Sequence, residues 1–395
     1  MYRERQIALL ERYFDLHTRR TTTLAPKTWR LRREAFTSDE VHRAERARVF
    51  RDRPLFLALS GDIPTPGDYA TYDVCGLPVA LLRGEDGVVR SLVNACRHRA
   101  MPVLEGRGRV SGRSFSCPFH AWTYDLNGRL LGQPLAQEGF ADCDRELLGL
   151  RALPVEEKHG LIFVVPTDSR SDAEPVLNSS AFLGDLEPEL IEFNIRAARF
   201  VEARTRTLPL NWKLVVDTFL ENYHVFSLHK QSIAPRFLST PSLIDVYGDV
   251  ARFVGSRSDI LGYLDKPQEE WDLLRYASIQ YLLPPHGILV YQYDHWETWH
   301  VYPGSHAGEC VVTTTIYAPG AEDDKPDQYY SKNLEYLIGI TDPEDFGAAQ
   351  KTHEGMAGGA VNEVVFGRNE SLLIHFHQVI ERMTNEAPPT GSPRG

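Results

Sequence analysis

The sequence has no long hydrophobic run, and its apolar residues never approach the ~18 in succession that a membrane helix needs. Residues Met1 to Gln6 carry charges of both signs with no apolar stretch behind them, so we expect no signal peptide and a cytoplasmic location. An excess of positive charge is also missing: 43 Lys and Arg stand against 54 Asp and Glu, a net charge of −11. This balance argues against a nucleic-acid partner.

Cysteine is scarce as well. Five cysteines in 395 residues are too few and too scattered for a disulfide framework. In a reducing compartment, cysteines with neighbouring histidines are better explained as metal ligands or catalysts. With 42% apolar and 25% charged residues, the remaining composition is that of an ordinary globular protein of one large or two ordinary domains.

The spacing of apolar and turn residues changes along the chain, and this change predicts the order of the domains. Helical spacing of apolar residues near the start gives way to short strands separated by turns from about residue 55. The polar segment 167–175 is rich in turn residues and is the predicted domain boundary. We predict an N-terminal helical segment (1–45), a small β-rich domain (46–166), a larger α+β domain (176–386) and a disordered tail (387–395).

Four residues in two short motifs form the first candidate metal site: Cys96-x-His98 and, after 18 intervening residues, Cys117-x-x-His120. Two loops at the tips of adjacent hairpins can bring these ligands around one metal group. Two sulfurs and two imidazoles suit either a tetrahedral zinc ion or a Rieske-type iron–sulfur cluster, in which the cysteines hold one iron and the histidines the other. Zinc fingers usually pair like ligands in sequence, whereas each motif here mixes them, so the pattern favours the Rieske cluster.

A second candidate site lies in the segment that begins Asn211-Trp-Lys, which we predict to be a helix to about Tyr223. Asp217, Glu221 and His224 would lie within about 60° of one another on that helix. His229 follows roughly 140° round, so both histidines can bind one metal only if the helix ends or distorts between them. Two histidines and a carboxylate with open coordination positions are typical of non-haem Fe(II) oxygenases.

The carboxylate of this second site has to come from elsewhere in the chain, and Asp345 is the best candidate. Pro343 suits the first turn of a helix, which would place Asp345 near a helix start. An aspartate there also has a simpler role, complementing the helix dipole. Asp342 and Glu344 compete with Asp345; if Asp345 is the ligand, Asp342→Ala and Glu344→Ala should retain iron.

These motifs together resemble the α subunits of Rieske non-haem iron oxygenases, also called aromatic-ring-hydroxylating oxygenases. The resemblance covers nearly the whole chain: the Cys-x-His and Cys-x-x-His pair, the Asn211-Trp-Lys opening, the acid-x-x-His-x4-His run and Asp345 after Glu344. It implies a [2Fe-2S] cluster on Cys96, His98, Cys117 and His120 in a β-rich Rieske domain. It also implies a mononuclear Fe(II) on His224, His229 and Asp345 in a helix-grip catalytic domain, an antiparallel sheet with helices.

The resemblance further implies how the two centres would cooperate. Glu221 falls at the position of the bridging carboxylate and would contact His120 or His98 of the next subunit in a head-to-tail homotrimer. The sequence leaves open whether a β subunit joins this trimer. Asp217 and Asn211 would hold the iron-binding histidines from behind. Ring dioxygenases usually carry Asp at the bridging position, whereas Glu221 resembles the branch that includes quaternary-amine monooxygenases.

The implied function is that of a terminal oxygenase, which uses O2 and electrons from NAD(P)H. A separate flavin and iron–sulfur reductase would deliver the electrons, with or without a ferredoxin. The substrate would be a small, aromatic organic molecule that is mono- or dioxygenated; the alternative is oxidative demethylation or hydroxylation of a methylated amine or methoxy compound. Two interpretations of other classes are a Rieske electron carrier, which would need only the cluster domain, and a zinc-binding protein, which would be colourless.

Overall fold

The computed structural model describes residues 1–167, 177–320 and 325–386, and its contacts divide the chain into two units. The first unit comprises Met1–Val49 and Ser180–Ala387, and the second comprises Phe50–Ser179. The predicted tail and nearly all of the predicted boundary segment lie outside the described residues. Within the described ranges, no helix combines the length and apolar character required to cross a membrane.

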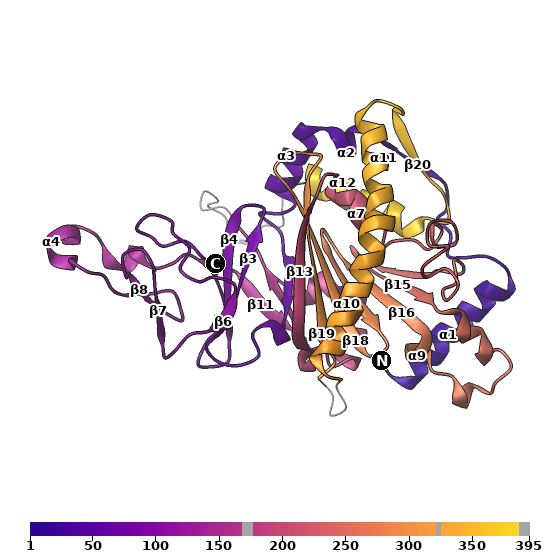
Figure 1. Cartoon of the computed structure of the whole chain (residues 1–395), viewed down its shortest axis with the longest axis horizontal. Coiled ribbons are helices and arrows are strands. Elements are labelled where there is room, and N and C mark those ends of the chain that lie inside the picture. The colour runs from indigo at the N-terminus through magenta and orange to yellow at the C-terminus, as the bar shows by residue number, and fades with distance from the viewer. Residues whose placement is uncertain (168–176, 321–324, 387–395) are drawn as a thin grey trace, which may run out of the picture. The chain divides into compact units, whose positions relative to one another are not determined.

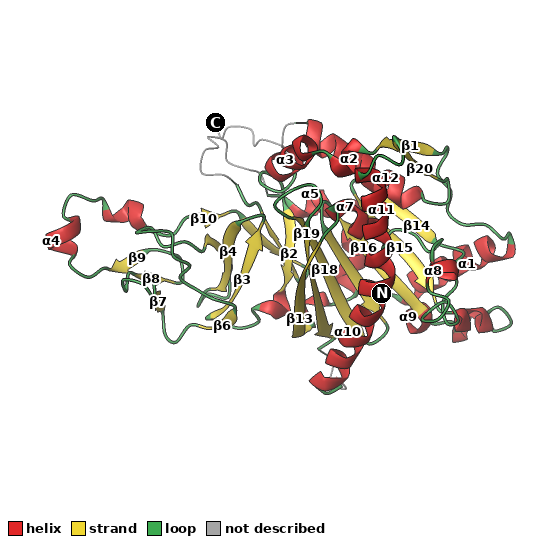
Figure 2. Ribbon diagram, turned by 45° about the horizontal axis from the view of Figure 1, so that its top comes forward, coloured by secondary structure: helices red, strands yellow, loops and turns green. Residues whose placement is uncertain are grey.

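The first unit is built on one seven-stranded antiparallel sheet with strand order β13-β19-β18-β17-β16-β15-β14, joined by the two-stranded pair β1-β20. Figures 1 and 2 show α10 and α11 running across one face of the large sheet, where α10 packs on β19 and β13. The strands are β1 (Trp29–Arg32), β13 (Arg199–Leu208), β14 (Leu243–Tyr247), β15 (Val250–Ser256), β16 (Ala277–Leu283), β17 (Gly287–Gln292), β18 (His295–Pro303), β19 (Cys310–Ala318) and β20 (Glu363–Phe366).

Some helices of this unit begin at a residue whose side chain caps the first turn. Ser38, for example, caps α3 by accepting hydrogen bonds from the backbone of Glu40 and Val41. The helices of this unit and at its boundary are α1 (Arg3–Thr18), α2 (Glu34–Thr37), α3 (Asp39–Arg48), α5 (Ser179–Leu183), α6 (Glu187–Glu192), α7 (Trp212–Asp217), α8 (Val225–Leu228), α9 (Leu273–Tyr276), α10 (Asp327–Thr341), α11 (Gly347–Ala357) and α12 (Ser371–Asn385).

The start of α7 is fixed by a buried polar contact to α3. Glu45 accepts hydrogen bonds from Trp212 Nε1 at 2.8 Å and from Lys213 Nζ at 2.6 Å. All three side chains are almost fully buried, so loss of either partner would leave an uncompensated charge inside the protein. The N-terminal helices therefore hold the segment that leads into the second candidate metal site.

The second unit is rich in β structure, as predicted. Its three antiparallel sheets have the strand orders β10-β5-β4-β3-β6, β11-β12-β2 and β7-β8-β9. Its elements are β2 (Leu55–Leu59), β3 (Asp68–Val74), β4 (Leu77–Arg83), β5 (Val89–Val93), β6 (Arg107–Arg109), β7 (Ser114–Ser116), β8 (Thr123–Asp125), β9 (Leu130–Gly132), β10 (Ala152–Leu153), β11 (Val155–Lys158), β12 (Leu161–Val164) and the short helix α4 (Ala136–Phe140).

A chain of hydrogen-bonded polar groups runs from the exposed Tyr329 to the buried start of β18. Tyr329 donates to Asp294 at 2.6 Å, and Asp294 in turn contacts His295 Nδ1 at 2.8 Å. Glu297 lies 3.1 Å from His295 Nε2 and also accepts from Trp299 Nε1 at 3.1 Å. Burial disfavours the imidazolium, but the hydrogen bonds to Asp294 and Glu297 outweigh it and raise the pKa of His295 to about 9.

This raised pKa predicts a pH-dependent contribution to stability. A group whose pKa rises on folding contributes fully below its unfolded value, here 6.5, and loses that contribution as pH rises through the folded value of about 9. We expect the difference in unfolding free energy between wild type and His295→Gln to shrink by about 3 kcal/mol between pH 6 and pH 10. Urea unfolding at several pH values measures it, and a pH-independent difference would contradict the assignment.

Candidate metal centres and active site

The two cluster-motif loops close in the same way. In each loop the cysteine N–H donates to a carbonyl five residues ahead, and its carbonyl accepts from an alanine held at positive φ. The bonds are Cys96 N to Met101 O at 2.8 Å and Ala100 N to Cys96 O at 2.8 Å, then Cys117 N to Trp122 O at 2.8 Å and Ala121 N to Cys117 O at 3.0 Å. Ala100 and Ala121 have φ of 59° and 56°, a conformation that costs alanine energy and is found where function demands it.

These loops bring two imidazoles and two thiols to one end of a buried core. His98 Nδ1 and His120 Nδ1 lie 3.2 Å apart, and both rings are half-buried. Cys96 and Cys117 are both 3% exposed within the same core cluster. Tyr124 Oη lies 3.3 Å from Cys96 Sγ, as a hydrogen bond to a ligand sulfur would require. The nitrogens of the two histidines and the sulfurs of the two cysteines fit the donor set of a Rieske cluster.

The second candidate site brings two histidines and one carboxylate together. Asp345 Oδ1 lies 3.3 Å from His224 Nε2 and 3.2 Å from His229 Nε2, and one ligand atom from each residue falls within 4.8 Å of the others. Metal–ligand bonds of about 2.1 Å at right angles would separate such atoms by about 3.0 Å. The three residues therefore fit one face of a metal ion and leave its other positions open.

Each of the two histidines has its other ring nitrogen occupied by a glutamate. Glu221 Oε1 lies 2.5 Å from His224 Nδ1, and Glu344 Oε2 lies 2.6 Å from His229 Nδ1. A carboxylate behind a metal-binding imidazole fixes the tautomer that leaves Nε2 free for the metal. Asp345 and Glu221 also favour the positively charged form of His224. Burial disfavours a charged imidazole, but the hydrogen bonds with these two acids outweigh it and raise the pKa of His224 to about 9.

The two histidines are separated by a short turn rather than a continuous helix. The helix predicted to reach Tyr223 is wrong beyond Asp217, where α7 ends. The Glu221 side chain accepts from the backbone N–H of His224 at 3.0 Å, and such side-chain bonds compete with helical ones. His224 and His229 then flank the single turn α8 at its N-cap and C-cap positions, which turns both rings toward Asp345.

Asp217 and Asn211 do not hold the iron-site histidines, which corrects that expectation. Because α7 ends at Asp217, its carboxylate turns toward α12, where it lies 2.9 Å from His377 Nε2. Asn211 caps α7 by accepting from the Lys213 backbone, and it donates to the carbonyl of Ala307 at 2.9 Å.

Asp345 lies within a π-helical turn, Asp342–Phe346, and not at a helix start as Pro343 suggested. The turn joins α10 to α11 in one helical run, so Pro343 falls inside that run. The helix-dipole role considered for Asp345 therefore does not apply. Burial would raise the pKa of Asp345, but hydrogen bonds from His224 and then His229 lower it below its usual value.

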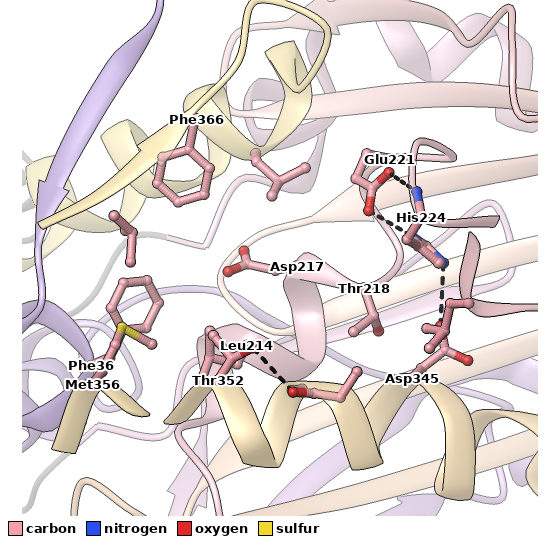
Figure 3. Close-up of a pocket in the computed structure, with 15 residues that line it drawn as sticks. Phe36, Leu214, Asp217, Thr218, Glu221, His224, Asp345, Thr352, Met356 and Phe366 are labelled. Atoms are coloured by element: carbon pink, nitrogen blue, oxygen red, sulfur yellow. Dashed lines mark hydrogen bonds and ion pairs between the residues drawn. The ribbon is translucent and has the colours of Figure 1, made fainter. Parts of the chain in front are cut away.

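A cavity of about 230 Å³ adjoins this site in the first unit. Figure 3 shows Glu221, His224 and Asp345 at one end of it, Phe36, Met356 and Phe366 at the other, and Asp217 between them. Its walls are otherwise mostly aliphatic, from α7, α8, α11, β20 and α12. A small organic molecule therefore has room beside two of the three candidate metal ligands.

Comparison with known proteins is consistent with both sites. Residues 195–386 match the ring hydroxylating alpha subunit (catalytic domain) family, and residues 53–153 match the Rieske [2Fe-2S] domain. The chain belongs to the α subunits of the Rieske non-haem iron oxygenases. The chain therefore combines a Rieske [2Fe-2S] domain with the family's catalytic domain, and the predicted α+β fold class is confirmed.

Individual relatives include the carnitine monooxygenase oxygenase subunit of Acinetobacter pittii, 32% identical over 203 residues, 51% of this chain and 53% of the relative. The 2-aminobenzenesulfonate 2,3-dioxygenase subunit alpha of an Alcaligenes species is 34% identical over 190 residues, 47% of this chain and 46% of the relative. The chain thus spans about half the length of the curated relatives it matches. A crystal structure of a quaternary ammonium Rieske monooxygenase shares the fold, with a TM-score of 0.76 and 21% identity over 92% of this chain and 96% of that chain.

Sequence reasoning missed Glu344 as a partner of the iron site. Its only signal was its position beside Asp345, which had made it a competitor for the ligand role. The same oxygen that meets His229, Glu344 Oε2, also accepts from Ser232 Oγ at 2.7 Å, so two groups hold it in place. The expectation that Glu344→Ala would retain iron normally is therefore revised.

We expect Glu344→Ala to weaken Fe(II) binding by about 10- to 100-fold, because His229 loses the group that orients its ring. Glu344→Gln keeps a hydrogen-bond acceptor and should lose less. Iron content after dialysis against a chelator measures the effect, with the exposed Glu354→Gln on α11 as control. Wild-type retention of iron in Glu344→Ala would show that His229 needs no such partner.

Proposed function

We propose that the protein is the terminal oxygenase of a Rieske non-haem iron system, oxidising a small organic substrate with O2 and electrons from NAD(P)H. The observation that carries this is the His224, His229 and Asp345 set, with both histidines backed by glutamates, in a chain that also has the paired cluster loops. An iron ion bound there would supply activation of O2 at its open positions. A Rieske electron carrier would have no use for this second site.

Different residues of the chain would hold the two metal centres. Cys96 and Cys117 would hold one iron of the cluster, and His98 and His120 the other. The two histidines are half-buried, so an electron-transfer partner can approach the cluster from their side, while the buried cysteine sulfurs are kept from solvent. In the catalytic unit, Glu221 fixes the orientation of one iron-binding histidine and lies at the edge of the cavity.

We propose a methylated amine as the substrate, in preference to an aromatic compound. Among the described residues that line the cavity, the charged ones are Asp217, Glu221 and Asp345 with the imidazole of His224, and none is Lys or Arg. Acidic groups together with the rings of Phe36 and Phe366 suit a small organic cation such as trimethylammonium. The relative from Acinetobacter pittii is named for carnitine, which carries that group.

The test is turnover with a reductase and NADH on carnitine, glycine betaine, choline, anthranilate and 2-aminobenzenesulfonate. We expect NADH-dependent oxidation of a trimethylammonium compound. The neutral isostere of choline, 3,3-dimethylbutan-1-ol, matches its shape without the charge and should compete poorly. Product from the aromatic acids alone would instead favour aromatic oxygenation, which the 2-aminobenzenesulfonate relative supports.

The electron partner we propose is a separate flavin and iron–sulfur reductase, with or without a ferredoxin, in the cytoplasm where NAD(P)H is supplied. We also propose a head-to-tail homotrimer in which Glu221 contacts His120 or His98 of the next subunit. Such a ring places an intact cluster beside an intact iron in every mixed trimer.

A complementation experiment tests the trimer. Homotrimers of His98→Ala, which lack a working cluster, and of His224→Ala, which lack iron, should both be inactive. Co-expressed mixed trimers should regain part of the activity, because some interfaces pair an intact cluster with an intact iron. Mixtures shown to be mixed that stay inactive would defeat electron transfer between subunits, and leave both metal sites in place.

A further inference from the structure

The π-helical turn that carries Asp345 places two consecutive acids around one imidazole. Glu344 meets Nδ1 of His229 at 2.6 Å, and Asp345 meets Nε2 of the same ring at 3.2 Å. Turns of this kind are rare, and they occur mostly as single turns inside α-helices at functional sites. The direction of the Asp345 carboxylate therefore depends on the turn keeping its unusual geometry.

The first and last residues of the π-helical turn both contact one arginine of the large sheet. Arg206, on β13, lies with its Nε 3.5 Å from Asp342 Oδ1, at the start of the turn. Its Cζ lies 5.9 Å from the ring centre of Phe346, at the end of the turn, and 5.7 Å from that of Trp299 on β18. The guanidinium is anchored to the sheet because Nη2 donates to Thr314 Oγ1 at 2.7 Å.

The same aromatic contacts reach the other half of the iron site. Phe219, two residues before Glu221, lies 4.7 Å from Trp299 and 6.4 Å from Phe346 between ring centres. Arg206 therefore lies against a cluster that supports both the segment leading to His224 and the turn carrying Asp345.

Stability alone explains this arrangement poorly. The Arg206 side chain is 14% exposed, and burial lowers its pKa while burial raises the pKa of Asp342. Among the described residues, Arg206 Nε and Nη1 and Asp342 Oδ1 are buried without a hydrogen-bond partner. A buried ion pair with unmet hydrogen bonds is often no more stable than an apolar pair of the same volume. Unmet buried groups of this kind call for another explanation.

We infer that Arg206 is a positioning residue for the mononuclear iron site: it fixes the π-helical turn from the sheet side and so aims the Asp345 carboxylate at the metal. This inference rests on the proposed ligand set of His224, His229 and Asp345. Arg206 itself touches neither metal nor substrate; it acts through Asp342 and Phe346.

Two variants test the role without leaving an unpaired buried charge. Arg206→Lys keeps the positive charge but loses the flat guanidinium that spans two rings and Thr314. The double variant Arg206→Met, Asp342→Asn removes both charges and keeps the packed volume. The matched control is Arg204→Met, two residues earlier on β13, whose side chain is 61% exposed and paired with Glu202.

The readouts are metal affinity and geometry, measured on full-length protein with its cluster intact and its mononuclear site emptied. Fe(II) affinity should fall about 10-fold in both Arg206 variants, as expected for a group outside the ligand set, and the visible bands of added Co(II) should shift. Arg204→Met should match wild type in both. Wild-type affinity and Co(II) spectrum in a folded double variant would overturn the inference.

His224→Ala separates this failure from failure of the ligand set. If His224→Ala loses the Co(II) bands while the Arg206 variants keep them unchanged, only the positioning role fails. If His224→Ala also keeps them, the metal lies elsewhere and the proposed function has to be revised.

Discussion

His224→Ala is expected to abolish substrate turnover while the visible and EPR spectra of the cluster remain those of wild type. The cluster motifs and His224 belong to separate compact units of the chain, so loss of one metal need not disturb the other. Asp345→Ala should behave in the same way, because its carboxylate lies between both imidazoles. Iron analysis should show that about one iron per chain is lost and that the two of the cluster are kept.

Asp342→Ala provides the comparison for Asp345. Asp342 lies on the sheet side of the turn, 3.5 Å from Arg206, and contributes no ligand atom to the metal group. This variant should therefore keep measurable activity. Full activity in Asp345→Ala would show that the third ligand has been assigned to the wrong carboxylate.

Glu221→Gln is expected to retain both metal centres and to slow electron transfer between them. Gln keeps the size of the side chain but removes the negative charge that faces His224 Nδ1 at 2.5 Å. A charge-assisted hydrogen bond is stronger than a neutral one, so the amide holds the histidine tautomer less firmly and weakens the bridge that we propose between the centres. The rate should fall toward the upper end of the ~10- to 100-fold range for such partners.

Single-turnover mixing of reduced protein with substrate and O2 measures this rate as oxidation of the cluster. Glu344→Gln is the matched control, because it removes the same charge behind the other histidine. It should affect iron retention more than the transfer rate. Wild-type cluster oxidation in Glu221→Gln would show that no carboxylate bridge is needed.

The local motifs of the sequence were sufficient to identify the candidate ligands. Cys96 and His98, like Cys117 and His120, lie within one turn of each other, so loop geometry alone keeps each pair together. Strands β13 and β16 to β19 of the large sheet were also predictable, since their apolar runs are bounded by turn residues, whereas β14 and β15 lie in a segment that was predicted to be irregular. The acidic charge balance by itself argued against a nucleic-acid partner.

Other features depended on contacts between residues far apart in the sequence. Asp345 is more than a hundred residues from His229, and sequence could not say which of three neighbouring acids would face the metal. The π-helical turn made that choice, directing Asp345 to Nε2 of both histidines, Glu344 to Nδ1 of His229 and Asp342 to Arg206. The spacing of apolar residues does not predict such a turn. A π-helical turn holds one residue more than an α-helical turn, and whether that residue is accommodated depends on packing at both ends.

The early end of α7 was decided in the same way. Helical spacing placed Asp217, Glu221 and His224 on one face, and propensity gave no reason to stop at Asp217. In the folded chain, Asp217 meets His377 from α12 and Glu221 caps the turn before His224. Sequence thus identified the candidate ligands of both metal sites, up to the choice among three neighbouring acids, because ligand chemistry is a property of residue types and short spacings. The tertiary structure alone decided which carboxylates orient the histidines, because a carboxylate takes its role from whatever distant group is packed against it.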